Sequence, residues 1–155
     1  MPKESLRDKI KGAVALDDII VTPLKRISTD GGDVMHALKF SEKEFNGFGE
    51  VYFSWVKQGA IKAWKCHKLM TLNLVVPLGE VRFVFHLAEK KGEFRVEKLG
   101  NNCYSRLTVP PGIWFGFYGI SSGSSLLMNV ADMEHDPDEV LRMKPSDLTF
   151  DWSVR

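Results

Sequence analysis

The sequence predicts an all-β fold, either a sandwich or a barrel of about ten short strands. Segments rich in β-branched and aromatic residues recur along the chain, and clusters of Gly, Pro, Asn and Ser separate them. No helical periodicity lies between successive segments, which excludes a parallel α/β arrangement. The spacing of strands and turns therefore indicates one antiparallel architecture.

One short helix is expected before the first strand and another after the last strand. Leu6, Ile10 and Val14 have the i, i+4 and i+8 spacing of one apolar helical face. A second helix is expected over 136–143, where Pro137 stands in the first turn and acidic residues follow it. The strands between them are expected at 19–21, 34–40, 49–56, 60–66, 72–76, 81–87, 94–98, 104–109, 113–120 and 126–131.

Size and charge limit the class of protein. The chain has 155 residues, enough for a single domain over 1–155 with one core. A formal net charge of +1 provides no electrostatic footprint for nucleic acid. The chain has no apolar run long enough to span a membrane, and its N-terminus has no signal-like apolar core, so a cytoplasmic location is expected. Cys66 and Cys103 are expected to be free thiols.

The stretch between Gly59 and Gly79 has the frame of a known metal-binding motif. In the cupins, which are small β-barrel domains, Gly and five residues precede His-x-His, then a Glu and a second Gly. Here Lys65 and His67 stand at the two His positions, and Thr71 stands at the Glu position. The spacing resembles that of a cupin, whereas most of the metal ligands are replaced.

A second cupin motif, Pro-x-Gly-x-x-His, is matched by 110–115, with Phe115 in place of the His. Only His67 then remains of the cupin ligand set, and one imidazole does not hold a transition metal. No metal and no cofactor are therefore expected. A metal-dependent cupin with an unusual ligand set is the least favoured alternative.

The order of several motifs resembles the dTDP-4-dehydrorhamnose 3,5-epimerase family of cupins, over roughly residues 20–152. The family has a Trp-containing strand that ends in His-x-His, a Gly-Glu-Val strand opening, and a Pro-x-Gly-x-x-His-Gly-Phe turn. It also has a Leu-Leu-x-Asn segment, an Asp-Pro pair and a final Asp-Trp pair. The matching segments are 61–67, 79–81, 110–117, 126–129, 136–137 and 151–152.

This resemblance implies a homodimeric jelly roll that acts on a sugar attached to a nucleoside diphosphate, without a metal. In the family, a His held by an Asp removes the proton beside the 4-keto group, and a Tyr on the opposite side returns a proton. The His corresponds to Lys65, the Asp to Asp147, the Tyr to Met128 and a phosphate-binding Arg to Lys62. Because Met donates no proton, the standard 3,5-epimerase reaction is not expected.

Strand alternation places Ala63, Lys65 and His67 on one face and Lys62 and Trp64 on the other. The face that carries Lys65 and His67 is expected to line the interior of the barrel. A candidate site should therefore lie on this inner face.

Alternative roles are open for each of these candidates. A desolvated Lys65 could act as a base, or as a charged group it could bind a phosphate or carboxylate. It could instead form a buried ion pair with Asp147 in an inactive relative. His67 could be a general acid or base, or a hydrogen-bonded interior His.

Aromatic residues and one amide complete the candidates. Trp114 and Tyr118 alternate with Phe115 and Phe117, so one pair is expected to pack the core and the other could stack on a base or sugar. Packing in the core or in a dimer interface is the alternative for each. Asn129 could hydrogen-bond a sugar hydroxyl, or it could cap a turn.

The sequence therefore predicts an isomerase or epimerase of a nucleotide-linked keto-sugar in surface-polysaccharide biosynthesis. The alternative is a non-catalytic cupin that binds a sugar or nucleotide. A homodimer that exchanges the strand at 19–24 is expected, with neither nucleic acid nor a membrane as a partner. The catalytic candidates are Lys65, His67 and Asp147, and the substrate-binding candidates are Lys62, Trp114, Tyr118 and Asn129.

Overall fold

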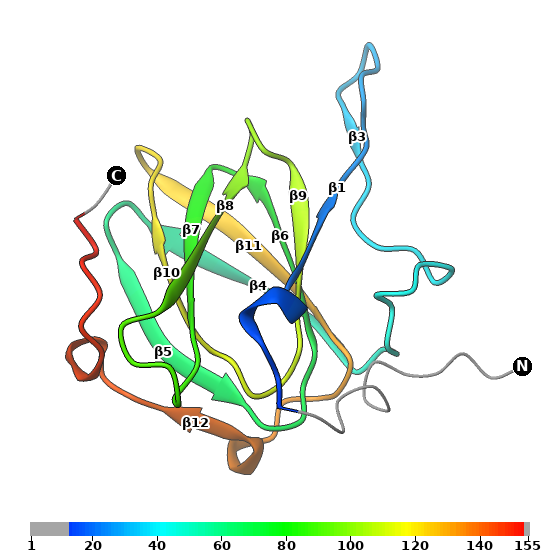
Figure 1. Cartoon of the computed structure of the whole chain (residues 1–155). Helices are drawn as coiled ribbons and strands as arrows, with labels where there is room; N and C mark the ends of the chain where they lie inside the picture. The colour runs from blue at the N-terminus through cyan, green and yellow to red at the C-terminus, as the bar shows by residue number, and fades with distance from the viewer. Residues whose placement is uncertain (1–12, 154–155) are drawn as a thin grey trace, which may run out of the picture.

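The computed structural model describes residues 13–153 and shows two antiparallel sheets packed face to face (Figure 1). The first sheet has the strand order β1 (Ile20–Pro23), β9 (Ser105–Val109), β6 (Leu72–Leu78), β11 (Ser124–Ala131) and β4 (Glu50–Lys57). The second sheet has the order β12 (Val140–Arg142), β5 (Ile61–His67), β10 (Trp114–Gly119), β7 (Glu80–His86) and β8 (Phe94–Gly100). A small hairpin of β2 (Arg26–Ile27) and β3 (Val34–Met35) projects from the sandwich (Figure 1).

Alternate residues of both sheets build one hydrophobic core between them. On β10, Phe115 and Phe117 face inward, and they lie opposite Phe85 and Phe83 of β7 in the register. Leu127 of β11 reaches the same core from the first sheet. Burying a side chain of this size contributes about 1.5–3 kcal/mol. The predicted all-β class is confirmed, and so is the alternation predicted for β10.

All ten predicted strand segments overlap a strand of the structure, but one of them is much shorter than expected. The segment predicted over 34–40 ends with β3, because the chain then leaves the hairpin and crosses the outer face of the first sheet. There, buried Arg106 donates to the Ala37 carbonyl and to the Glu42 carboxylate, both at 2.6 Å. Asn73 donates to the Glu44 carbonyl at 3.3 Å. These bonds hold the crossing segment over β9 and β6.

The C-terminal helix predicted over 136–143 is wrong. The 3₁₀ turn η2 (Pro137–Glu139) is capped by Asp136, whose side chain accepts a bond from the Asp138 amide. The chain then extends into β12, which pairs with the edge of β5. This pairing satisfies the backbone groups along that edge, which would stay unpaired if residues 140–142 formed a solvated helix.

Only 3₁₀ turns are found among the helical elements of residues 13–153. These turns are η1 (Leu16–Asp18), η2 and η3 (Pro145–Asp147). The helix predicted from Leu6 and Ile10 falls on residues 1–12, outside the described part of the chain.

Candidate active site

Lys65 and His67 lie on the inner face of β5, as predicted. Lys65 pairs with the core residue Phe115 in the register, so both side chains point between the sheets. The ring of His67 stacks on the ring of Phe115, with a centroid distance of 6.0 Å and an interplanar angle of 20°. The strand prediction therefore identified the correct face for these two residues.

An irregularity in β5 adds Lys62 to the inner face, which corrects the simple alternation. The pairing with β10 shifts so that core residue Phe117 lies opposite Lys62. A Cβ at Gly116 would lie only 2.5 Å from the Cβ of Ala63, so glycine allows the two strands to approach closely here. Ala63 is thereby placed on the outer face beside Trp152. Lys62 donates through Nζ to the carbonyl of Trp55, at 2.9 Å.

A buried carboxylate holds His67. The Nδ1 atom of His67 hydrogen-bonds with Oε1 of Glu139, and the two residues are only 7% and 3% exposed. Oε2 of Glu139 also accepts bonds from the backbone amides of Leu69 and Met70, at 3.1 and 3.2 Å. The turn η2 presents Glu139 to the end of β5, where Val140 pairs with His67.

The surroundings of Glu139 keep its carboxylate charged. Burial alone would raise the pKa of Glu139, but the bonds from His67 and from the two amides hold it below its ordinary value. An ionised carboxylate can only accept, so Nδ1 of His67 must donate. In the neutral ring, Nε2 is then the unprotonated nitrogen, which is the one that can act as a base.

A tyrosine and an asparagine form the opposite wall. Asn129 of β11 and Tyr52 of β4 are register partners, and Nδ2 of Asn129 donates to the Tyr52 hydroxyl at 3.0 Å. Burial raises the pKa of Tyr52; the bond from Asn129 opposes this effect, and the charges of Glu50 and Glu139 add to it. The register places Tyr52 and Asn129 on the inward face of the first sheet, and Lys65 and His67 lie on the inward face of the second, so these side chains come from facing surfaces of the sandwich.

Lys65 is surrounded by positive charge. Burial lowers the pKa of Lys65, and the nearby charges of Arg142 and Lys62 lower it further. Asp147 is exposed, and its side chain accepts a bond from the Lys144 amide at 2.8 Å. No ion pair between Lys65 and Asp147 is found within residues 13–153, and the carboxylate that contacts His67 is that of Glu139.

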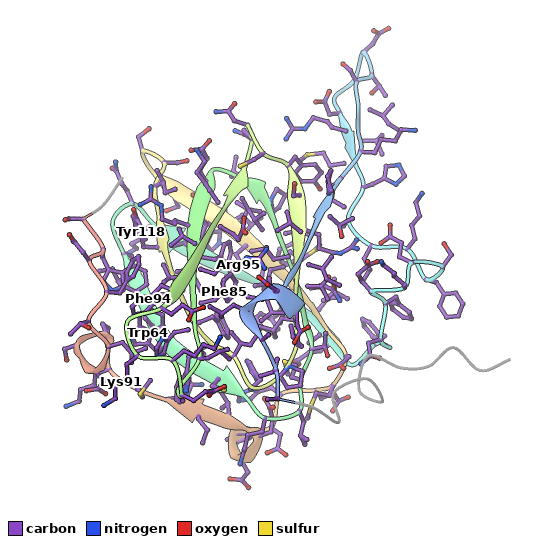
Figure 2. The ribbon with its side chains drawn as sticks, in the orientation of Figure 1. Trp64, Phe85, Lys91, Phe94, Arg95 and Tyr118 are labelled. Carbon is purple, nitrogen blue, oxygen red and sulfur yellow. The ribbon has the colours of Figure 1, made fainter. Side chains whose placement is uncertain are left out.

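Trp114 and Tyr118 do not join this cluster, because they lie on the outer face of the second sheet. The Tyr118 ring meets Trp152 edge-on, at 5.7 Å. Trp64 also packs against Trp152 on this face, at 5.2 Å, and near Phe94, at 6.2 Å. Figure 2 shows Trp64, Phe94 and Tyr118 on the side of the molecule where the C-terminal segment runs. The structure therefore separates these aromatic candidates from His67.

Sequence reasoning missed Glu139 and Tyr52 as site residues. Tyr52 could have been found, because it lies four residues before buried Val56 on a predicted strand. Residues an even number of positions apart point to the same face of a strand, so Tyr52 shares the inward face of Val56. Glu139 carries no local signal, since 72 residues separate it from His67.

The described part of the chain contains neither a metal-binding cluster nor a membrane-spanning helix. Within residues 13–153, no three His, Cys, Asp or Glu side chains come close enough together to hold a metal ion. None of the helical turns described is long and apolar enough to cross a bilayer. Cys66 and Cys103 are both free, as expected.

No protein-family model and no curated protein matches the chain. Among solved structures, the dTDP sugar isomerase from Desulfovibrio desulfuricans G20 is similar, with 32% identity and a TM-score of 0.83. The match covers 90% of this chain and 95% of that chain. The 3,4-ketoisomerase QdtA from Thermoanaerobacterium thermosaccharolyticum has a TM-score of 0.69 at 18% identity, over 83% of this chain and 90% of its own. The epimerase RmlC from Legionella pneumophila has a TM-score of 0.74 at 16% identity, over 92% and 82%.

The two packed sheets, with polar residues on their inner faces, define a cupin-like β-sandwich. Because the chain is 32% identical to the dTDP sugar isomerase over 90% of its length, the protein belongs to the RmlC-like family of dTDP-sugar isomerases and epimerases.

Proposed function

We propose that the protein is an isomerase or epimerase of a nucleotide-linked keto-sugar in surface-polysaccharide biosynthesis. The observation that carries this proposal is the buried His67–Glu139 pair on the inner face of β5. A carboxylate that fixes one imidazole nitrogen leaves the other as an oriented base, which is what proton abstraction beside a ketone requires.

The proposed reaction begins when Nε2 of His67 removes a proton from the carbon beside the ketone. The electron pair of the broken C–H bond moves to the carbonyl oxygen and gives an enolate, and Glu139 stabilises the imidazolium. The ammonium group of Lys65 stabilises the enolate oxygen. Return of a proton to the opposite face of the same carbon completes an epimerisation. Return of the proton to the former carbonyl carbon completes an isomerisation, in which the proton of the neighbouring hydroxyl passes to the former carbonyl oxygen and the neighbouring carbon becomes the ketone. Tyr52, on the opposite sheet, is the proposed second proton donor.

The charges near β5 support a nucleoside diphosphate as the carrier of the sugar. The charges of Lys62 and Arg142 both act on Lys65, and such a group of cations suits a diphosphate. The QdtA relative was solved with TDP and, as a variant, with TDP-4-keto-6-deoxyglucose. We therefore propose a dTDP-linked 4-keto-6-deoxyhexose as the substrate class.

Deuterium exchange tests this function, and Lys65→Ala is its sharpest variant. In deuterated water, the wild-type protein is expected to introduce deuterium beside the ketone of a dTDP-4-keto-6-deoxyhexose, as followed by NMR. Loss of one enolate-stabilising donor should slow exchange by about 10²-fold. Lys65→Arg, which keeps the charge, should retain more activity than Lys65→Ala.

The second candidate function is binding without catalysis, and the same samples distinguish the two. Tight binding of the sugar nucleotide with no exchange in the wild-type protein would favour a binding protein. Equal exchange rates in the wild type and Lys65→Ala would remove Lys65 from the mechanism.

We also propose a homodimer that forms through the outer face of the first sheet, on the β4 side. Phe53 and Trp55 are each 59% exposed there, beside Val51. Their register partners on β11 include Met128 and Leu126, so the apolar surface continues across two strands. An apolar patch on one sheet face can be covered by its own copy around a two-fold axis. β1 pairs with β9 of the same chain, so this interface does not need the exchanged strand.

Trp55→Lys is expected to shift the protein from dimer to monomer, because it places a charge at the centre of the apolar patch. Light scattering after size-exclusion chromatography would measure the mass. Leu141→Lys is the matched control, because Leu141 is also an exposed apolar residue but lies on β12 of the second sheet. A wild-type monomer, or equal effects of the two changes, would contradict the proposed interface.

A further inference from the structure

The two polar ends of the Asn129 side chain have different surroundings. Asn129 is 1% exposed and lies between the sheets, beside core residue Leu74 in the register. Its Nδ2 atom donates to the Tyr52 hydroxyl, whereas its Oδ1 atom is buried with no hydrogen-bond partner among the described residues. A buried polar atom without a partner is unfavourable, so its persistence at this site needs an explanation.

The bond from Asn129 also sets the direction of the Tyr52 proton. A phenol that accepts a hydrogen bond at its oxygen must direct its own O–H elsewhere. Tyr52 is 41% exposed, and its pairing with buried Asn129 places it on the inward face of β4, opposite the sheet that carries His67. The Tyr52 proton is therefore free to point at a molecule that lies between Tyr52 and His67.

We propose that Asn129 is a positioning and specificity residue: Nδ2 aims the Tyr52 hydroxyl proton at the substrate, and Oδ1 accepts a hydrogen bond from a hydroxyl of the sugar. This inference rests on the proposed function, because it needs a sugar between β5 and β11. Under this proposal, Oδ1 of Asn129 gains its hydrogen-bond partner only when the substrate binds. A sugar without that hydroxyl would leave Oδ1 unpaired, and such sites reject the poorer analogue strongly.

Asn129→Leu separates a functional role from a structural one. Leucine is similar in size and suits a core that already contains Leu74 and Leu127. Replacing a buried, half-satisfied amide with an apolar group is expected to leave the thermal midpoint unchanged or raised. The exchange rate should nevertheless fall by at least about tenfold. A lower midpoint with unchanged exchange would overturn the proposal.

Asn129→Asp is the matched partner, because it keeps the acceptor and removes the donor. Tyr52 would then donate to the new carboxylate, so its proton would be withheld from the substrate. Asn129→Asp should therefore lose activity as Asn129→Leu does. Wild-type activity in Asn129→Asp would contradict the positioning role.

Two readouts do not depend on turnover. Calorimetry should show weaker binding of the keto-sugar nucleotide to Asn129→Leu and unchanged binding of dTDP, which lacks the keto-sugar. Equal weakening of both would overturn the contact with the sugar. Absorbance titration of the phenols, with Tyr52→Phe identifying one among the 3 tyrosines, should show a higher pKa for Tyr52 in Asn129→Leu, because the bond that lowers it is lost.

These readouts separate this inference from the function on which it rests. An unchanged Tyr52 titration in Asn129→Leu would overturn the positioning of Tyr52, even in an active enzyme. A shifted titration together with no exchange in the wild-type protein would support the positioning and overturn the proposed isomerase.

Discussion

His67→Gln is expected to slow deuterium exchange beside the ketone by about 10²–10⁴-fold, the usual contribution of a positioned general base. The physical reason is that the Gln amide has no basic nitrogen, while its NH₂ group can still donate to Glu139 as Nδ1 of His67 does. NMR of the sugar ring protons in deuterated water would measure the change. This variant removes the base and keeps the carboxylate partnered.

The control for His67→Gln is the stability of the variant. Because Glu139 keeps a donor, the thermal midpoint should stay close to that of the wild type. Persistence of exchange in His67→Gln would transfer the role of base to another group on the inner face. In that case, Lys65 would be the first to test, because its lowered pKa makes a neutral amine more accessible.

Glu139→Ala is expected to lower the free energy of unfolding by about 3–5 kcal/mol, because each buried donor left without an acceptor costs about 1–3 kcal/mol. The change leaves three donors without their acceptor: Nδ1 of His67 and the amides of Leu69 and Met70. Urea denaturation would measure the loss. The exchange rate should fall as well, because nothing then orients the imidazole ring.

Glu139→Gln is the matched control for size, since its amide oxygen can still accept from one of these donors. It should be more stable than Glu139→Ala. If Glu139→Ala were as stable as the wild type, the carboxylate would not be part of the structural network, and its role in orienting His67 would be in doubt.

The lowered pKa of Glu139 also predicts a dependence of stability on pH. A carboxyl group whose pKa is lower in the folded protein stabilises it above the pKa of the unfolded chain. This contribution should be complete at pH values above the ordinary pKa of a Glu side chain, and it should be lost as the pH falls through the lower pKa that Glu139 has in the folded protein. Urea midpoints measured at several pH values should fall less steeply in Glu139→Gln. Parallel curves for the two proteins would contradict the lowered pKa.

Local pattern predicted most of the fold. Alternation on β10 separated Phe115 and Phe117 from Trp114 and Tyr118, since successive side chains of a strand point to opposite faces. Strands β2 and β12 were not predicted, because segments of two or three residues carry too little pattern. The helix predicted over 136–143 failed because its sequence signals compete with a free strand edge that only the folded sheet provides.

The sequence by itself determined the all-β class and the inward direction of Lys65 and His67, because both follow from alternation and turn signals along the chain; the packing of two sheets into a sandwich is decided by the tertiary structure. It could not determine the partner of the imidazole, because the carboxylate comes from a turn 72 residues away and reaches His67 only when β12 pairs with β5. Nor could it place Lys62, because the shift in β5 depends on the close approach of Ala63 to Gly116. Only the tertiary structure, in which one sheet faces the other, decided that Tyr52 and Asn129 stand across from the base.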